Sequence, residues 1–119
     1  NFEGTKSTVG NPHFMIEVDD VDGFDLENLN TEVYNKNIFP DGVNLEIYQI
    51  INRNYIKARV YERGVGETDA CGSGALCMFN YLNKTDQINN KSFVIYPGGD
   101  LYLRFENNNL YLSGEVIYL

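Results

Sequence analysis

The chain has 119 residues, with 9 Lys and Arg against 17 Asp and Glu, which gives a formal net charge of -8. This length fits a single domain over residues 1–119, and a hydrophobic content of 43% can build a packed core. The acidic balance argues against binding to nucleic acid, which needs Lys and Arg to neutralise phosphates. No apolar run approaches the length of about eighteen residues that a membrane span needs, so we expect no membrane contact.

The first half of the chain predicts strands with one helix between them. Residues 13–18 form a short apolar run that is typical of a strand. Apolar residues at positions i, i+3 and i+7 over residues 26–33 predict a helix that ends before the loop at 35–37. Within residues 45–60, two β-rich runs flank residues 52–54 and predict a hairpin with one buried face.

The second half begins with glycines and ends with strands. Residues 63–74 carry four glycines and are not expected to form a regular strand, whereas the apolar spacing over 75–82 predicts a helix. Three β-rich runs over residues 92–118, with turns between them, predict an antiparallel meander. The elements together predict an α+β domain, in which a curved antiparallel or mixed sheet forms a barrel-like wrap around a central helix.

The Gly-rich segment is also the part of the sequence richest in reactive side chains. Cys71 stands at the entrance of the predicted helix, where unpaired N–H groups and the helix dipole favour an anion. We therefore expect a lowered pKa for the Cys71 thiol, which could then act as a base. The small residues Gly72 and Ser73 leave backbone amides open to a bound carboxylate. Glu62 and Arg63 offer a partner for the thiol and a guanidinium for a second carboxylate.

The two cysteines receive different interpretations. A single cysteine before a helix is more often structural than catalytic, but the glycines, Glu62 and Arg63 close to Cys71 favour catalysis, because a plain turn would not need so much glycine. Cys77 lies about 9 Å further along the same helix on another face and is expected to be a core residue. Without a second Cys or His pair at ligand spacing, the cysteines predict neither a disulfide nor a metal site and suit the reducing cytoplasm.

A second polar cluster, GNPH at residues 10–13, precedes the first predicted strand. It can be a tight turn, but His13 is the only histidine of the chain, and histidine is the residue type best suited to exchange protons at neutral pH, so a role in proton transfer is the alternative. Asn44, directly before an apolar run, is also ambiguous, because a polar asparagine at such a position is usually a turn residue. The turn at residues 97–100 is expected to be structural only.

Four stretches of the sequence are recognisable together: GNPH at 10–13, FPDGVN at 39–44, RVYERGVGETDACGSGA at 59–75 and YPGGDL at 96–101. In order and spacing they resemble the C-terminal half of the diaminopimelate epimerases. The resemblance implies an isomerase that interconverts LL- and meso-2,6-diaminopimelate, in lysine and peptidoglycan biosynthesis, without a cofactor. It further implies two catalytic cysteines, one from each of two domains, on opposite faces of the reacting α-carbon.

The resemblance also implies roles for individual residues. Cys71 resembles the catalytic cysteine of the C-terminal domain, and Glu62 resembles its polar partner. Gly72 and Ser73 resemble the residues whose amides hold the reacting carboxylate. The residues that resemble the groups recognising the distal end of the substrate are Asn11, Asn44 and Arg63. His13 resembles the histidine that lies near the other cysteine.

That other cysteine belongs to an N-terminal domain that this chain lacks, and Cys77 is misplaced to replace it. Inversion needs an acid and a base on opposite faces of the carbon, because a single base returns the proton to the face it left. We therefore expect the chain alone to be inactive. The partners implied are diaminopimelate, the missing N-terminal domain and, for the whole enzyme, a second copy in a homodimer.

Three other functions stay open at this point. A related two-cysteine racemase, such as a histidine racemase, would act on another amino acid, although Arg63, Asn11 and Asn44 favour a substrate with a second amino-acid group. A non-catalytic binding domain would keep the fold and show an ordinary thiol at Cys71. A Cys–His amide hydrolase would need His13 beside Cys71.

Overall fold

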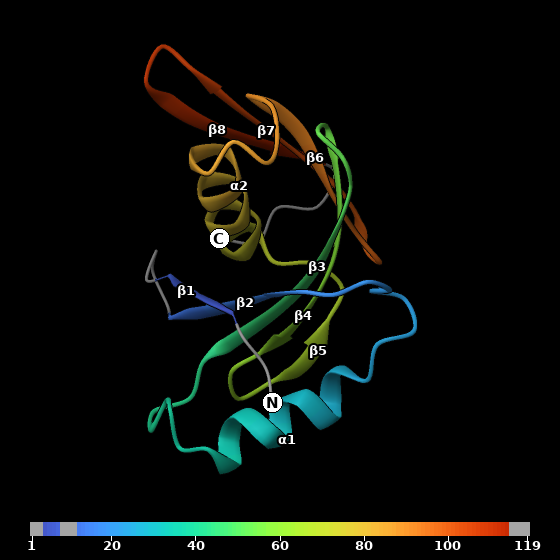
Figure 1. Cartoon of the computed structure of the whole chain (residues 1–119), viewed down its shortest axis with the longest axis vertical. Coiled ribbons are helices and arrows are strands. Elements are labelled where there is room, and N and C mark those ends of the chain that lie inside the picture. Colours follow the sequence, from blue (N-terminus) through green and yellow to red (C-terminus); the bar gives the residue numbers. More distant parts are fainter. Residues whose placement is uncertain (1–3, 8–11, 115–119) are drawn as a thin grey trace.

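The computed structural model describes residues 4–7 and 12–114. Over this part of the chain, two α-helices and the strands of one β-sheet follow each other as shown in Figure 1. The helices are α1 (Leu26–Asn35) and α2 (Gly72–Lys84). The strands are β1 (Thr5–Ser7), β2 (His13–Glu17), β3 (Asn44–Asn52), β4 (Tyr55–Glu62), β5 (Gly66–Thr68), β6 (Lys91–Tyr96), β7 (Gly99–Glu106) and β8 (Asn109–Gly114).

The sheet is mixed and runs in the order β1-β2-β3-β4-β6-β7-β8, with β5 paired to β4 beside this path. The pairs β2–β3 and β4–β6 are parallel, and the other pairs are antiparallel. Parallel neighbours need a crossover connection, and here α1 joins β2 to β3 while α2 lies between β4 and β6. The α+β class and the mixed sheet are therefore confirmed, and the described sheet is an open path from β1 to β8.

The two helices cover opposite faces of the sheet. Side chains alternate along a strand, so Leu45 and Ile47 of β3 pack with the buried residues of α1, whereas Tyr48 packs with those of α2. The core around α2 is the larger and includes Phe79 and Leu82 together with side chains from β4, β6 and β7. Figure 1 shows α2 beside β6, β7 and β8 and α1 at the other end of the molecule.

Local signals in the sequence account for several element boundaries. Asp25 is the N-cap of α1, and its Oδ1 accepts a hydrogen bond from the amide of Asn28 at 3.0 Å. The β7–β8 turn places Asn107 and Asn108 at φ 53° and 63°, which is the backbone of a tight hairpin turn that asparagine tolerates. The predicted helix at 26–33, the hairpin over 45–60 and the meander that follows residue 91 are confirmed, the meander as far as residue 114.

Residues 63–74, which were not expected to form a regular strand, contain the short strand β5. The short strand β5 pairs antiparallel with the end of β4 after a tight turn. Gly66 begins it at φ 112°, a backbone conformation that a residue with a Cβ rarely adopts. The glycines therefore allow this hairpin rather than prevent it.

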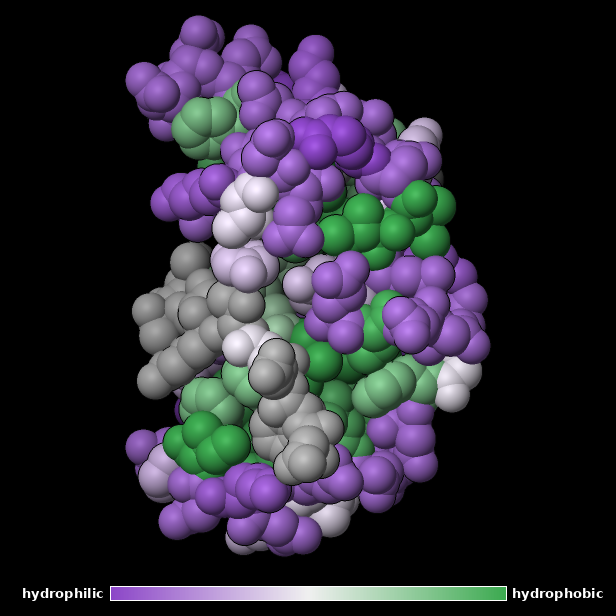
Figure 2. All heavy atoms as spheres, viewed as in Figure 1, coloured by the Kyte–Doolittle hydropathy of each residue, from purple (hydrophilic) through white to green (hydrophobic). Residues whose placement is uncertain are grey.

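The visible surface is divided by polarity. Figure 2 shows hydrophilic residues over the end that carries α1 and over the far end of the β7–β8 hairpin, with apolar residues exposed between them.

Of the two helices in the described part of the chain, neither combines the length and apolar character that crossing a membrane requires.

Candidate active site

Polar side chains gather on the α2 face of the sheet, where β2 and β3 begin and β4 ends. The parallel register pairs His13 with Asn44, and the antiparallel register pairs Leu45 with Tyr61, so that Asn44 lies near Glu62 at the end of β4. Residues two apart on a strand share a face, so Glu46 points to the same side as Asn44. The first turn of α2 lies over this group. Gly74 is so close to the carboxylate of Glu46 that a Cβ on Gly74 would clash with it.

Cys71 is the N-cap of α2, at the helix entrance that the sequence predicts. Its backbone is extended, with φ -146° and ψ 109°. Its Sγ accepts a hydrogen bond from the amide of Gly74 at 3.4 Å and lies 3.4 Å from Oγ of Ser73. The helix offers no internal acceptor for the amides of Gly72 and Ser73, which are its first N–H groups. The sulfur atom therefore lies among backbone donors that favour negative charge.

The burial of Cys71 corrects one expectation. The residue is 3% exposed and belongs to the core around α2. Burial raises the pKa of its thiol from the ordinary 9.0, the hydrogen bonds with Ser73 and Gly74 lower it, and the carboxylates of Glu46 and Glu62 raise it again. The predicted lowering of the pKa is thus wrong for this chain, because desolvation outweighs the hydrogen bonds with Ser73 and Gly74.

His13 and Glu46 form a fully buried pair. Nδ1 of His13 lies 2.7 Å from Oε1 of Glu46, and both side chains are 0% exposed. Burial raises the pKa of the Glu46 carboxyl, and the contact with His13 opposes that effect. Glu46 was not predicted as a site residue, although a signal was present: a glutamate interrupts the apolar run of β3, between residues that are buried.

Asn44 and Arg63 are connected through the backbone. Oδ1 of Asn44, which is 4% exposed, accepts a hydrogen bond from the amide of Arg63 at 2.8 Å. The guanidinium of Arg63 donates to the carbonyl of Asp41 at 3.3 Å. Gly42, at φ 84°, makes room for this side chain, since a Cβ there would lie 2.7 Å from Cδ of Arg63. Two residues predicted to bind one ligand group are therefore held together by the fold.

Some contacts expected of the other predicted residues are formed in the structure, and one is not. Glu62 accepts a hydrogen bond from the hydroxyl of Thr68 on β5. The ring of His13 bonds to Glu46, and the hydrogen bonds of Cys71 within the described chain go to other groups. The Cys–His contact that an amide hydrolase requires is thus not formed among these residues. Asn11 lies outside the described residues.

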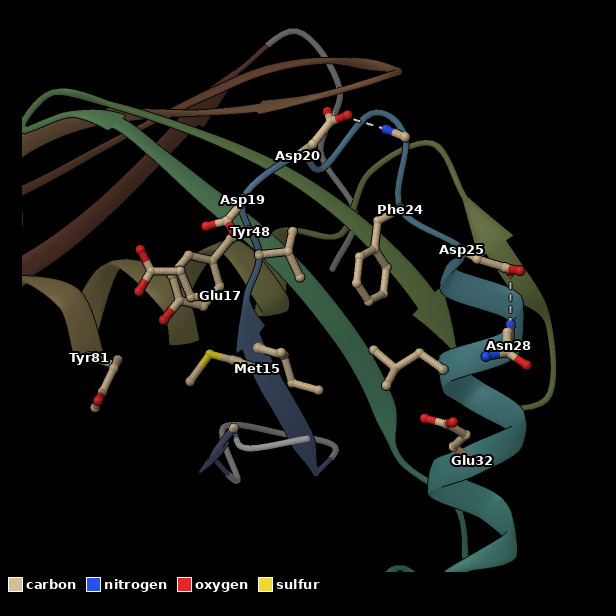
Figure 3. Close-up of a pocket in the computed structure, with 15 residues that line it drawn as sticks. Met15, Glu17, Asp19, Asp20, Phe24, Asp25, Asn28, Glu32, Tyr48 and Tyr81 are labelled. Carbon is tan, nitrogen blue, oxygen red and sulfur yellow. Dashed lines mark hydrogen bonds between the residues drawn. The ribbon is translucent and has the colours of Figure 1, made fainter. Parts of the chain in front are cut away.

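A large open hollow lies away from this group of residues. It measures about 1510 Å³ and is lined by parts of β2, β3 and both helices, including Tyr48 and Tyr81 (Figure 3). Neither Cys71 nor His13 lines it. Its carboxylate side chains are Glu17, Asp19, Asp20, Asp25 and Glu32. Their negative charge disfavours a ligand with carboxylate groups. The amides at the entrance of α2 favour such a ligand, so the hollow and the helix entrance do not suit the same ligand.

Solved structures with a similar fold match most of this chain. The PhzF-family phenazine biosynthesis protein of Enterococcus faecalis matches with a TM-score of 0.64 and 15% identity, over 87% of this chain and 37% of that one. The Bacillus anthracis protein of the same family gives 0.61 and 18%, over 93% and 36%. At such identities the similarity defines the fold alone.

Sequence comparison is more specific. The family model for diaminopimelate epimerase matches residues 5–119. The diaminopimelate epimerase of Brachyspira hyodysenteriae (strain ATCC 49526 / WA1) is 41% identical over 117 residues, which are 96% of this chain and 41% of that protein. The chain therefore belongs to the diaminopimelate epimerase family, which consists of isomerases. It spans about two fifths of the length of the curated relative that it matches.

Proposed function

We propose that this chain is the C-terminal half of a diaminopimelate epimerase, which interconverts LL- and meso-2,6-diaminopimelate by moving a proton at the α-carbon. The observation that carries the proposal is the position of Cys71 as the N-cap of α2, next to amides that have no acceptor within the helix. It lies in the segment at residues 59–75 through which the sequence resembles the family. The 41% identity to the Brachyspira hyodysenteriae epimerase supports the same substrate.

The chemistry requires two groups on opposite faces of the carbon. A thiolate from the missing half removes the α-proton, and the electron pair of the C–H bond moves toward the carboxylate. The amides of Gly72 and Ser73 stabilise the charge that develops there. Cys71 then donates its thiol proton to the other face, and the reverse reaction exchanges the two roles. The raised pKa of the Cys71 thiol suits a proton donor, and Glu62 acts as its polar partner.

The distal amino-acid group of the substrate is recognised by Arg63, Asn44 and Asn11. Arg63 can bind a carboxylate through two parallel N–H donors. Asn44 supports it, because its side chain fixes the backbone amide of Arg63. A site of this kind discriminates against an amino acid without the second group, because such a ligand would bring no carboxylate to the guanidinium.

The complete enzyme needs the N-terminal half, which supplies the second cysteine close to His13. In that enzyme the sheet forms a barrel-like wrap around α2, and the substrate binds between the two halves, without a cofactor. We place the enzyme in the cytoplasm, as a homodimer that serves lysine biosynthesis. Without the second cysteine, the 119-residue chain alone does not epimerise.

A chimaera tests the proposal directly. The segment of the Brachyspira hyodysenteriae epimerase that matches this chain is replaced by it, and isomer ratios and deuterium uptake from solvent are measured at the α-carbon. The chimaera is expected to interconvert the isomers, Cys71→Ala to lose about 10²-fold or more of the rate, and the matched control Cys77→Ala to retain it. Full activity in Cys71→Ala would exclude the proposal. Faster turnover of histidine than of diaminopimelate would favour the racemase alternative.

A further inference from the structure

Two polar atoms next to the candidate site have no partner in the described part of the chain. They are Nε2 of His13 and Oε2 of Glu46, and both are buried. The other polar atom of each side chain is used in their mutual contact of 2.7 Å. Buried polar atoms without a hydrogen bond are rare in folded proteins because each one costs free energy. Their presence indicates that a further polar group belongs beside them.

The pair is enclosed by several elements at once. His13 comes from β2 and Glu46 from β3, and the first turn of α2 lies against the carboxylate because Gly74 has no side chain. The titratable groups that act on Glu46, or on which Glu46 acts, are His13, Glu62, Cys71 and Tyr96. A buried polar pair of this kind is a weak source of stability, since apolar side chains would fill the same space at lower desolvation cost. A function in the site explains it better than packing does.

We infer that Glu46 is a positioning residue: it accepts the Nδ1 proton of His13, fixes the tautomer of the ring and presents Nε2 as the atom that exchanges protons. This inference rests on the proposed function. Glu46 does not reach the substrate itself and acts through His13. The partner of Nε2 is a polar group of the substrate or of the missing half, and a histidine ring held at one nitrogen is a well-suited acid or base at the other.

The ring of His13 can be observed without ambiguity, because the chain has a single histidine. In the ¹⁵N spectrum of the 119-residue chain at neutral pH, Nδ1 is expected to carry the proton and to be hydrogen-bonded. In Glu46→Gln this preference is expected to be lost. The matched control Glu17→Gln changes an exposed glutamate at the end of β2 and is expected to leave the ring signals unchanged. A proton on Nε2 instead of Nδ1 in the unsubstituted chain would overturn the inference. This outcome does not depend on whether any variant folds.

The second measurement uses the chimaera. Glu46→Gln is expected to lower kcat about 10-fold or more with KM nearly unchanged, and to shift the pH profile of kcat/KM. A merely structural role would leave that profile in place, and Glu46→Asp, which retains the carboxylate, is expected to recover part of the rate. If the chimaera does not epimerise at all, the proposed function fails, while the ring spectrum still tests the tautomer. If it epimerises and Glu46→Gln matches Glu17→Gln in rate and profile, the inference fails alone.

Discussion

The hydroxyl of Tyr96 donates a hydrogen bond to the backbone carbonyl of Cys71 over 3.2 Å in the protein interior. The same carbonyl accepts the amide of Ala75 at 3.0 Å, which is the first bond of α2. Close by, the amide of Gly98 donates to the carbonyl of Asp69 at 2.9 Å. The end of β6 and the turn after it are thus tied to the segment that leads into Cys71. They hold the backbone from which the Cys71 side chain projects.

Tyr96→Phe removes the hydrogen bond from the Tyr96 hydroxyl to the carbonyl of Cys71 and changes little else. The carbonyl of Cys71 keeps its bond from Ala75, so no buried acceptor is left without a partner. We expect a loss of about 1 kcal/mol in the free energy of unfolding, the net value of one hydrogen bond. Urea denaturation measures it. An unchanged midpoint would mean that this bond does not hold the N-terminus of α2.

Gly74→Ala is expected to destabilise the chain although alanine is the better helix former. A Cβ at this position would meet the carboxylate of Glu46, whose Cδ would lie 3.1 Å away. Overpacking costs about 1–3 kcal/mol, against about 1 kcal/mol gained in helix propensity. Asn80→Ala, a substitution elsewhere on α2, is the control and is expected to be neutral or stabilising. Stabilisation of Gly74→Ala in the same urea assay would show that Glu46 is not packed against the helix.

The stability of the chain is expected to fall at alkaline pH. Burial and the nearby Glu17 raise the pKa of Tyr48 from 10.0 to about 12. Below pH 10 its phenol is neutral in both states. Between about pH 10 and 12 the unfolded chain releases the proton while the folded chain retains it, so the free energy of unfolding decreases as the pH rises. Urea midpoints on either side of pH 10 measure the decrease.

The matched controls are two phenylalanine variants. Tyr48→Phe is expected to reduce the alkaline loss of stability, although the buried Tyr96, whose pKa is raised well above 10.0, contributes as well. Tyr34→Phe removes a hydroxyl from a side chain that is 79% exposed and is expected to leave the loss unchanged. Equal behaviour of the two variants would contradict the assignment to Tyr48.

The elements that could be predicted from the sequence are those with local causes. The helix α1 has apolar residues at i, i+3 and i+7 and an aspartate N-cap, and the β3–β4 hairpin has its turn residues between two alternating runs. The parallel pairing of β2 with β3 and of β4 with β6 was not predicted. Parallel neighbours depend on where a crossover helix packs, and this information is spread over the whole chain.

In the candidate site, too, the features with local causes could be predicted, and those that depend on distant residues could not. The position of Cys71 at a helix entrance follows from the glycines and the helical spacing after them, which are local signals. Its burial does not, because the side chains that cover the thiol come from other strands, and burial reverses the direction of the pKa shift. Glu46 was missed for a related reason: its partner, His13, is 33 residues away in the chain.

Alkylation of Cys71 by iodoacetamide, measured in a Cys77→Ala chain so that one thiol remains, tests the environment of the sulfur atom. Because burial raises the pKa of the thiol from 9.0, the reactive thiolate is expected to form only above about pH 9. At about pH 8 the folded chain is therefore expected to react more slowly than the same chain unfolded in urea.

Two variants show which charges act on the thiol. Glu62→Gln removes a carboxylate that raises the pKa of Cys71 and is expected to move the inflection of the alkylation rate to lower pH. Glu17→Gln, on β2, removes a carboxylate that does not act on this thiol and is expected to leave the inflection in place. An inflection well below pH 9 in the parent chain would mean that the helix terminus outweighs burial after all. In that case Cys71 would be a base in the resting chain, and the proton donor of the first step would have to come from the other half.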